Sequence, residues 1–208
     1  MSVPIRRSPL ARMHEGLGAS FEAEAGWEVV AGYGDDTAER QAVREALAVV
    51  DVTPRGKVDV RGALAGALSV VGDAITARVS DQWALVFTEP GGEEVLLPKI
   101  ESAAASSAMV TDATHLFAGL ALAGPALPEV LSLLTSWDPA SLSPGASTGA
   151  PIGDVRAVVV RRDLELPVLE VYVATEFARY LGETVLDAAG RVGGAPAGWR
   201  ALKAGGWS

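Results

Sequence analysis

The chain has 208 residues, of which 49% are hydrophobic and 21% are charged, and its formal net charge is −9 at pH 7. This composition supports a buried core and excludes a chain that is disordered throughout. The sequence has no cysteine, which excludes disulfides and Cys nucleophiles, and its two histidines, His14 and His115, are too few for a His-rich metal site. We therefore expect a folded protein without a metal site.

The charge is uneven along the chain. Residues 79–154 contain nine acidic side chains and one basic one, Lys99. Because phosphate binding needs a basic surface, this acidic middle disfavours nucleic acid and anionic membranes as partners. No segment has about 18 uninterrupted apolar residues, and the arginines within residues 1–13 are not followed by the apolar stretch of a secretory signal. We expect a cytoplasmic protein that does not cross a membrane.

Two helices are predicted near the start of the chain. Ser8-Pro9 can begin a helix that ends near Gly18, because serine caps helices and proline suits the first helical position. Asp36 and Glu39 have the spacing of a capping box at the start of a second helix. The apolar face of this second helix is formed by Val43, Leu47 and Val50.

The next part of the sequence alternates short strands and helices. Residues 57–61 alternate charged and apolar side chains, which predicts a strand with one buried face. A short Ala/Leu helix around 63–71 follows, then strands near 74–79 and 82–88, and a helix over about 93–106. This part of the chain therefore mixes both element types.

The second half predicts strand, helix, strand, strand and helix in that order. An apolar strand covers residues 116–123, and a helix with a leucine-rich face follows it. Residues 138–151 are rich in proline, serine and glycine and predict a long loop. Strands over 155–161 and 167–173 lead to a helix that Thr175 caps. This order is most of a ferredoxin-like split βαβ unit, so we predict the α+β class.

Reactive residue types occur in three places that do not by themselves predict catalysis. Gly145-Ala146-Ser147-Thr148-Gly149 matches the hydrolase pattern G-x-S-x-G, but a predicted loop precedes it, whereas that nucleophile needs a strand-to-helix turn. His14 lies on a predicted helix, where we expect a surface residue or a satisfied boundary residue, and His115 lies at the start of an apolar strand, where a structural role is favoured. Arg161-Arg162 either binds a carboxylate or forms a solvated strand end, and we favour the solvated strand end.

Several short segments between residues 8 and 62 form an ordered set. They are Ser8-Pro9-Leu10, Gly18-Ala19, Ala25-Gly26-Trp27-Glu28, Tyr33-Gly34, Ala42-Val43-Arg44, Asp51-Val52, Gly56-Lys57 and Val60-Arg61-Gly62. No single segment is specific. The set as a whole resembles the start of the glycine-cleavage T-protein family, in which similar segments follow one another in the same order at nearly the same spacing. This family belongs to the folate-binding aminomethyltransferase superfamily.

The resemblance continues more weakly along the rest of the chain. Leu120 to Pro125 resembles the family segment L-x-G-P, Leu169 to Val173 resembles a following strand, and Pro196 to Arg200 resembles the stretch P-x-G-L-x-A-R. The resemblance implies an α+β fold like the T-protein folate-binding domain, without the family's C-terminal barrel domain. It implies a single domain over 1–208 with lobes of about 1–110 and 111–208.

Family members bind tetrahydrofolate in a central channel, and the resemblance implies which side chains contact it. Glu170 aligns with a glutamate that contacts the pterin, and Arg200 aligns roughly with an arginine near the folate tail. A flat pterin can stack on an aromatic ring, which makes Trp83 a third candidate. The five tryptophans of the chain are nevertheless more typical of core packing or a subunit interface. Tetrahydrofolate is therefore the implied cofactor, and no catalytic residue is assigned.

The departures from the family lead to two functional hypotheses. The family carries a catalytic aspartate in a G-G-x-x-D-D segment, whereas here only Asp73 and Asp81 lie between Gly62 and Trp83. A similar shortening occurs in the small gamma-type subunit of heterotetrameric sarcosine oxidases, which resembles the same family. We expect a partner-dependent subunit that takes part in transferring a one-carbon unit from an amine to tetrahydrofolate. The alternative is a non-catalytic scaffold subunit of a sarcosine oxidase or demethylase complex, and both hypotheses require a larger protein subunit.

Overall fold

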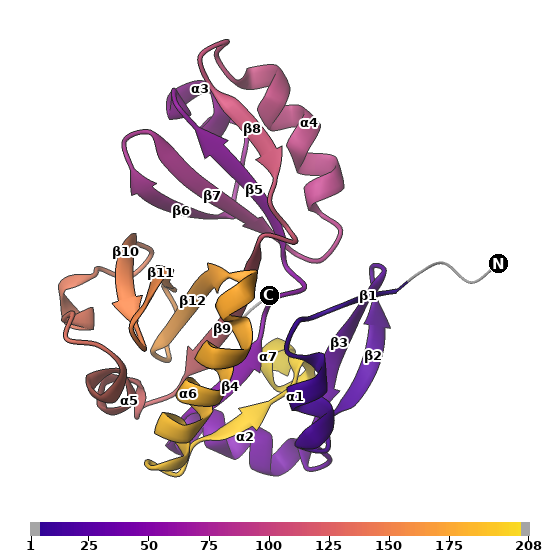
Figure 1. Ribbon diagram of the computed structural model, residues 1–208, viewed down its shortest axis with the longest axis vertical. Coiled ribbons are helices and arrows are strands. Elements are labelled where there is room, and N and C mark those ends of the chain that lie inside the picture. The colour runs from indigo at the N-terminus through magenta and orange to yellow at the C-terminus, as the bar shows by residue number, and fades with distance from the viewer. Residues whose placement is uncertain (1–4, 205–208) are drawn as a thin grey trace.

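The computed structural model describes residues 5–204, which form three β-sheets flanked by helices (Figure 1). The largest sheet has six strands in the order β10-β11-β12-β9-β4-β13. A four-stranded sheet has the order β6-β7-β5-β8, and a three-stranded sheet has the order β1-β3-β2. In Figure 1 the four-stranded sheet lies above the six-stranded one, and the three-stranded sheet lies to one side.

The elements have the following bounds. The strands are β1 (Arg6–Arg7), β2 (Ser20–Glu24), β3 (Trp27–Gly32), β4 (Ala48–Asp51), β5 (Gly56–Arg61), β6 (Ile75–Ser80), β7 (Trp83–Thr88), β8 (Met109–Asp112), β9 (Phe117–Ala123), β10 (Ser147–Ile152), β11 (Val155–Arg161), β12 (Val168–Ala174) and β13 (Ala195–Ala197). The helices are α1 (Ala11–Gly16), α2 (Asp36–Glu45), α3 (Leu64–Leu68), α4 (Glu93–Ala103), α5 (Leu127–Leu134), α6 (Ala178–Gly190) and α7 (Trp199–Ala204), with 3-10 turns η1 (Pro139–Ser141) and η2 (Thr175–Phe177).

The two larger sheets stack face to face between two pairs of helices. Successive side chains of a strand point to opposite faces, so each strand of the stack contributes to two cores. On β12, Leu169 and Val171 pack toward α5 and α6, whereas Val168 and Tyr172 pack toward the four-stranded sheet. On β7, Leu85 faces the six-stranded sheet and its neighbours face α3 and α4. The result is an α/β/β/α stack.

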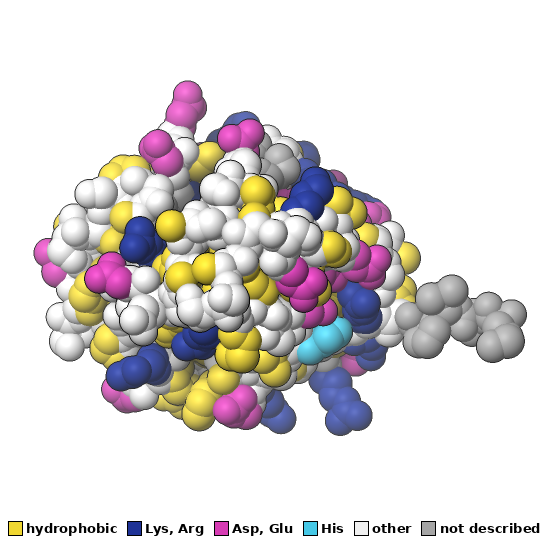
Figure 2. Space-filling model, turned by 90° about the horizontal axis from the view of Figure 1, so that it is seen from above, with side chains coloured by type: hydrophobic (Ala, Val, Ile, Leu, Met, Phe, Trp, Pro, Cys, Tyr) yellow, Lys and Arg dark blue, Asp and Glu magenta, His cyan; other side chains and the backbone are white. Residues whose placement is uncertain are grey.

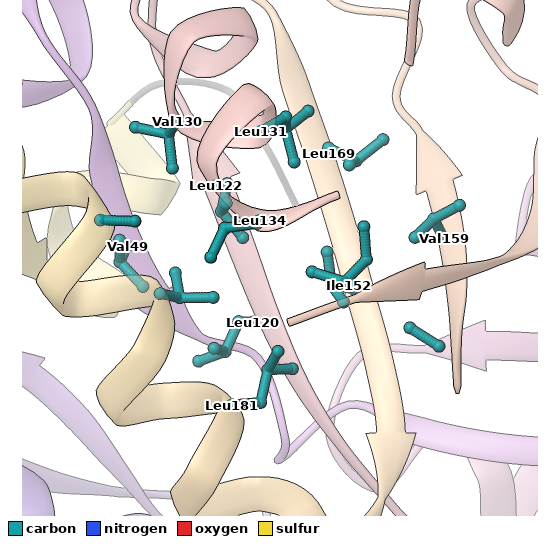
Figure 3. Packing of buried hydrophobic residues seen from close by; sticks show 14 of the residues in the cluster. Val49, Leu120, Leu122, Val130, Leu131, Leu134, Ile152, Val159, Leu169 and Leu181 are labelled. Atoms are coloured by element: carbon teal, nitrogen blue, oxygen red, sulfur yellow. The ribbon is translucent and has the colours of Figure 1, made fainter. Parts of the chain in front are cut away.

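The core behind the six-stranded sheet is aliphatic. Figure 3 shows Leu120, Leu122 and Leu169 from the sheet lying close to Leu131 of α5 and Leu181 of α6. These side chains are at most 2% exposed. Each buried leucine contributes roughly 1.5–3 kcal/mol to folding before entropy costs. This core anchors the strand that carries Glu170.

The second core lies between the two large sheets, and we call it the inter-sheet layer. It contains Ala77, Leu85 and Phe87 from the four-stranded sheet and Val158 and Tyr172 from the six-stranded sheet. All five are at most 4% exposed. The layer is the region of the fold in which the candidate site lies.

The predicted split βαβ unit is confirmed, and so is the α+β class. Strands β9 and β11 both pair antiparallel with β12, which lies between them, so β9 and β11 run parallel to each other across α5. The six-stranded sheet also contains β4, which pairs antiparallel with β9. It therefore takes strands from both of the lobes expected at about 1–110 and 111–208.

The chain passes from one large sheet to the other between β4 and β5, and returns between β8 and β9. Lys57 joins these two connections. Its ammonium nitrogen Nζ donates to the carbonyl oxygens of Thr53 at 2.7 Å and Arg55 at 2.8 Å, and lies 3.4 Å from that of Thr114. The alternating pattern predicted Lys57 on the polar face of its strand, but the residue is fully buried. Its ammonium group binds the backbone carbonyl oxygens of the two crossing connections. Burial lowers the pKa of Lys57 to about 7.

The second predicted helix begins and ends differently from the expectation. Asp35, not Asp36, caps it, accepting hydrogen bonds from the N–H groups of Thr37 and Ala38. Glu39 instead accepts from the N–H groups of Tyr33 and Gly198. The helix ends at Glu45, and Val50 belongs to β4, so the predicted apolar stripe joined two elements.

The loop predicted over 138–151 is partly wrong, because its last part is the edge strand β10. Pro151 lies within that strand, which an edge position tolerates since one side of the strand needs no hydrogen-bond donors. Ser147 begins the strand and donates to the carbonyl oxygen of Arg78. No helix follows Ser147, so the strand-to-helix turn of a serine hydrolase is absent there.

Candidate functional site

Glu170 lies on β12 in the inter-sheet layer and is 1% exposed. Its Oε1 accepts a hydrogen bond from Nη1 of Arg162 at 2.6 Å and lies 3.6 Å from Nη2 of Arg55. Its Oε2 accepts from the hydroxyl of Tyr172 at 2.6 Å. A buried carboxylate needs such compensation, because desolvation otherwise disfavours the charge. The interpretation of Arg161-Arg162 as a solvated strand end is wrong for Arg162, because it pairs with Glu170.

Tyr172 closes the site on the side of the four-stranded sheet. The residue is fully buried, and its ring stacks on Phe87 with 4.1 Å between ring centroids. Burial first, and then the Glu170 carboxylate, raise the pKa of Tyr172 well above its ordinary value. The hydroxyl therefore stays protonated and donates to Glu170.

Gly119 on the neighbouring strand β9 makes room for the Tyr172 ring. The two residues are register partners, and a Cβ at position 119 would lie 2.4 Å from the ring. A glycine inside an otherwise apolar strand indicates such a close approach. This glycine was the sequence signal that could have indicated a filled site.

Arg55 connects the Glu170 site to the turn after β7. Its side chain is 1% exposed, and Nη1 donates to Oε1 of Glu89 at 3.0 Å. Burial opposes the charge, but the carboxylates of Glu170 and Glu89 and the Tyr172 oxygen keep the pKa of Arg55 above its ordinary value. Sequence reasoning missed Arg55 and Lys57, because charged residues in a chain crossing give no periodic signal.

The other two residues implied to contact folate lie elsewhere. Trp83 is half-buried on β7, where its Nε1 donates to Oδ1 of Asp59 at 2.7 Å and Arg61 lies 4.0 Å over its ring. Arg200 lies on α7 at the surface, where its guanidinium pairs with Glu22 of β2. Trp83 and Tyr172 line the same cleft, whereas neither Glu170 nor Arg200 is among the residues that line it.

That cleft, of about 790 Å³, opens between the two large sheets. Its lining is mainly apolar and includes Trp83, Phe117, Tyr172 and Phe177, with Arg156 among the polar residues. A second cleft, of about 480 Å³, lies beside α5 and contains Trp137. Both volumes are in the range of small-molecule sites.

The two aspartates between Gly62 and Trp83 do not enter the inter-sheet layer. Asp73 and Asp81 are both exposed, and Asp81 pairs with Arg78. Strand β6 contributes Ala77 to the layer, and Ile75 and Val79 of the same strand pack against the layer. Strand β6 therefore presents apolar side chains to the inter-sheet layer.

A second buried polar network lies at the other end of the six-stranded sheet. His14 is 3% exposed, not a surface or boundary residue as expected; its Nδ1 lies 2.6 Å from the Tyr33 hydroxyl and its Nε2 3.2 Å from Oδ2 of Asp51. Burial raises the pKa of Asp51, but the hydrogen bond and charge of His14 outweigh it and hold that pKa below its ordinary value. The network joins α1 to β4.

The remaining sequence observations have structural outcomes. Trp27 and Trp199 are buried in the core, His115 stacks on Trp27, and Trp207 lies outside the described residues. Among residues 5–204, no helix is long and apolar enough to cross a membrane. Within the same residues no group of three His, Asp or Glu side chains is placed to hold a metal ion. In the view of Figure 2, acidic and basic side chains are interspersed.

The residues present do not fit a pterin at Glu170. Both carboxylate oxygens already accept hydrogen bonds from the chain, and Tyr172 and Phe87 fill the space beside them. The carboxylate is enclosed, so a ligand would have to displace one of these partners to reach it. The arrangement holds a charge in place and joins the β11–β12 connection to the crossing segment.

Comparison with solved structures places this α/β/β/α stack in a class. It resembles the glycine cleavage system aminomethyltransferase T from Bartonella henselae with a TM-score of 0.78 and 20% identity, covering 95% of this chain and 60% of that one. It also resembles a chain of the heterotetrameric sarcosine oxidase from Corynebacterium sp. U-96, with a TM-score of 0.67 and 17% identity, covering 91% of this chain and 97% of that one. The fold is that of the T-protein class of α+β domains.

Sequence comparison assigns the family. The model of the GCVT N-terminal domain matches residues 66–204. The aminomethyltransferase of Cutibacterium acnes is 30% identical over 89% of this chain, and that of Saccharopolyspora erythraea is 27% identical over 97%. The chain spans about 60% of the length of these curated relatives. The chain belongs to the GCVT N-terminal domain family, which confirms the resemblance seen in its sequence.

Proposed function

We propose that this chain is a partner-dependent subunit of a complex that removes a one-carbon group from an amine, with tetrahydrofolate as the acceptor for that group. Its larger partner is an amine-oxidising or demethylating protein. The family supports the one-carbon chemistry, since the similar curated proteins are aminomethyltransferases. The similarity to nearly the whole of one chain of a heterotetrameric sarcosine oxidase supports the subunit role.

The observation that supports a protein partner is an exposed apolar rim beside the cleft between the two large sheets. Leu116, Phe177 and Tyr180 are 58%, 43% and 47% exposed, and they lie where β9 and α6 begin. The rim is held together by the backbone, because the N–H of Thr175 donates to the carbonyl oxygen of Leu116. Exposed apolar side chains that gather in one place favour a protein contact there.

Co-purification from the native source tests the proposal. We expect a companion chain with amine-oxidising or demethylating activity and an assembly larger than a monomer in sizing. Replacing Phe177 and Tyr180 by Asp should abolish the assembly without lowering the melting midpoint, whereas Val95→Asp, on the exposed face of α4, should leave it intact. A stable monomer with no such companion would contradict the proposal.

The alternative is a scaffold that takes no part in chemistry. Both carboxylate oxygens of Glu170 already accept hydrogen bonds from the chain, and Asp73 and Asp81 are exposed. These observations favour a scaffold over direct participation in the transfer. Aminomethyl transfer needs a carboxylate placed near the reacting amine and a closed site that excludes water. Activity of the assembled complex tests the scaffold: substitutions at Glu170 that preserve assembly should leave its turnover unchanged, and a loss of turnover in an intact assembly would contradict the scaffold.

A further inference from the structure

We infer that Glu170 in this chain is a structural residue that the fold itself uses, and that Glu170 is not a pterin-binding carboxylate in any complex the chain joins. The inference rests on the proposed function, because it states what this subunit does not supply to the shared chemistry. It is carried by the contacts of the carboxylate and by the residues that fill the space around it.

The first step concerns the acceptor atoms. A carboxylate that binds the amine groups of a pterin must present at least one oxygen to the ligand. Here Oε1 receives Arg162 at 2.6 Å and Arg55 is 3.6 Å away, while Oε2 receives Tyr172 at 2.6 Å. Charge-assisted hydrogen bonds of this length are the strong ones, so the oxygens are held by the chain.

The second step concerns the space. A flat ring needs an open slot beside the carboxylate, and the phenol of Tyr172 occupies the position next to it. Phe87 stacks on that phenol from the opposite sheet, and Gly119 leaves room for it on the neighbouring strand. The three residues form a packed contact between the sheets, which a bound ring would have to break.

The third step concerns the arginines. Arg162 follows β11, and Arg55 lies in the connection from β4 to β5, so one carboxylate holds two separate segments. Arg162 is 13% exposed at its side chain and Arg55 only 1%. Without Glu170, Arg162 would lose its carboxylate partner in a largely buried position. Removing the carboxylate therefore costs stability, in contrast to the removal of a ligand-binding group that has no partner in the fold.

The experiment compares stability and ligand binding in the full chain. Glu170→Gln should lower the melting midpoint by roughly 5–10 °C. Glu22→Gln, which breaks the exposed pair with Arg200, is the matched control and should leave the midpoint unchanged within error. An unchanged or raised midpoint for Glu170→Gln would overturn the inference.

Titration with 5-formyltetrahydrofolate, a stable reduced folate, supplies the second readout and needs no variant. Tryptophan fluorescence and calorimetry should show no saturable binding to the wild-type chain up to roughly 1 mM. Saturable binding that Tyr172→Phe or Glu170→Gln weakens more than tenfold would overturn the inference. This arm also decides the matter if Glu170→Gln does not fold.

The same titration on the assembled complex separates this inference from the proposed function. If a complex forms and binds the folate, Tyr172→Phe should change its dissociation constant less than twofold, and a tenfold loss would overturn the inference. If no complex forms, the proposed function fails, while the stability and titration results on the single chain still decide whether Glu170 is structural.

Discussion

The family resemblance implies that Glu170 and Arg200 contact the same ligand, but the two residues lie in opposite surroundings. Glu170 is enclosed between two sheets and bonded to Arg162 and Tyr172. Arg200 lies at the surface of α7 and pairs with Glu22. Ion pairs at the surface are screened by water, whereas breaking a buried pair leaves an uncompensated charge. The comparison teaches that the same pairing of acid and base stabilises the fold in one region and contributes little in the other.

The largest effect is expected on the buried side of this comparison. Arg162→Met should lower the free energy of unfolding by about 3 kcal/mol, because it leaves Glu170 buried with one fewer charged donor. Urea denaturation measures the loss. A change below about 1 kcal/mol would mean that the carboxylate is solvated, and the contrast with Arg200 would break down.

A buried cation extends the comparison to Lys57, whose pKa is lowered to about 7 by burial. Between about pH 7 and pH 10 the unfolded chain holds the lysine proton more firmly than the folded chain does, so stability rises with pH in this window. The unfolding free energy of the wild type, relative to Lys57→Met, should therefore increase by about 2 kcal/mol from pH 7 to pH 9. Denaturation of both proteins across this range measures it, and a constant difference would show that Lys57 is charged in the fold.

A smaller effect isolates the hydroxyl that donates to Glu170. Tyr172→Phe keeps the ring stacked on Phe87 and removes one hydrogen bond to a charged group. The free energy of unfolding should fall by about 1.5 kcal/mol, the lower end of the range for a hydrogen bond to a charged group. Thermal and chemical denaturation should agree, and a stabilised variant would show that the hydroxyl is not satisfied by Glu170.

The smallest effect is expected at Arg200. Its guanidinium forms an exposed pair with Glu22, so Arg200→Ala should leave the melting midpoint unchanged within error. Differential scanning calorimetry at low and high salt checks this. A clear loss of stability would place Arg200 in the same energetic class as Arg162 and remove the contrast.

The sequence was sufficient for the strands and helices whose patterns are regular. The alternation over 57–61 and the apolar run over 116–123 correspond to β5 and β9, and the split βαβ order follows from them. Strand β10 was missed because Pro151 and the glycines around it are typical of loops, and only its edge position permits a strand.

The site was predictable in part. The resemblance indicated Glu170 as a candidate site residue on a predicted strand. No pattern in the sequence indicates that Arg162, in the β11–β12 connection, pairs with Glu170. Arg55 and Lys57 lie in a chain crossing, where burial is set by contacts between distant segments. Such long-range burial is a property of the stacked sheets and leaves no local periodicity.

A double-mutant cycle between Glu170 and Arg162 tests most directly whether the carboxylate serves the fold. Glu170→Gln, Arg162→Met and the double variant would be unfolded in urea alongside the wild type. A coupling energy of about 2 kcal/mol is expected if the two groups bind each other in the buried layer. A coupling below about 0.5 kcal/mol would contradict a structural Glu170, because two independent, solvated side chains give that value.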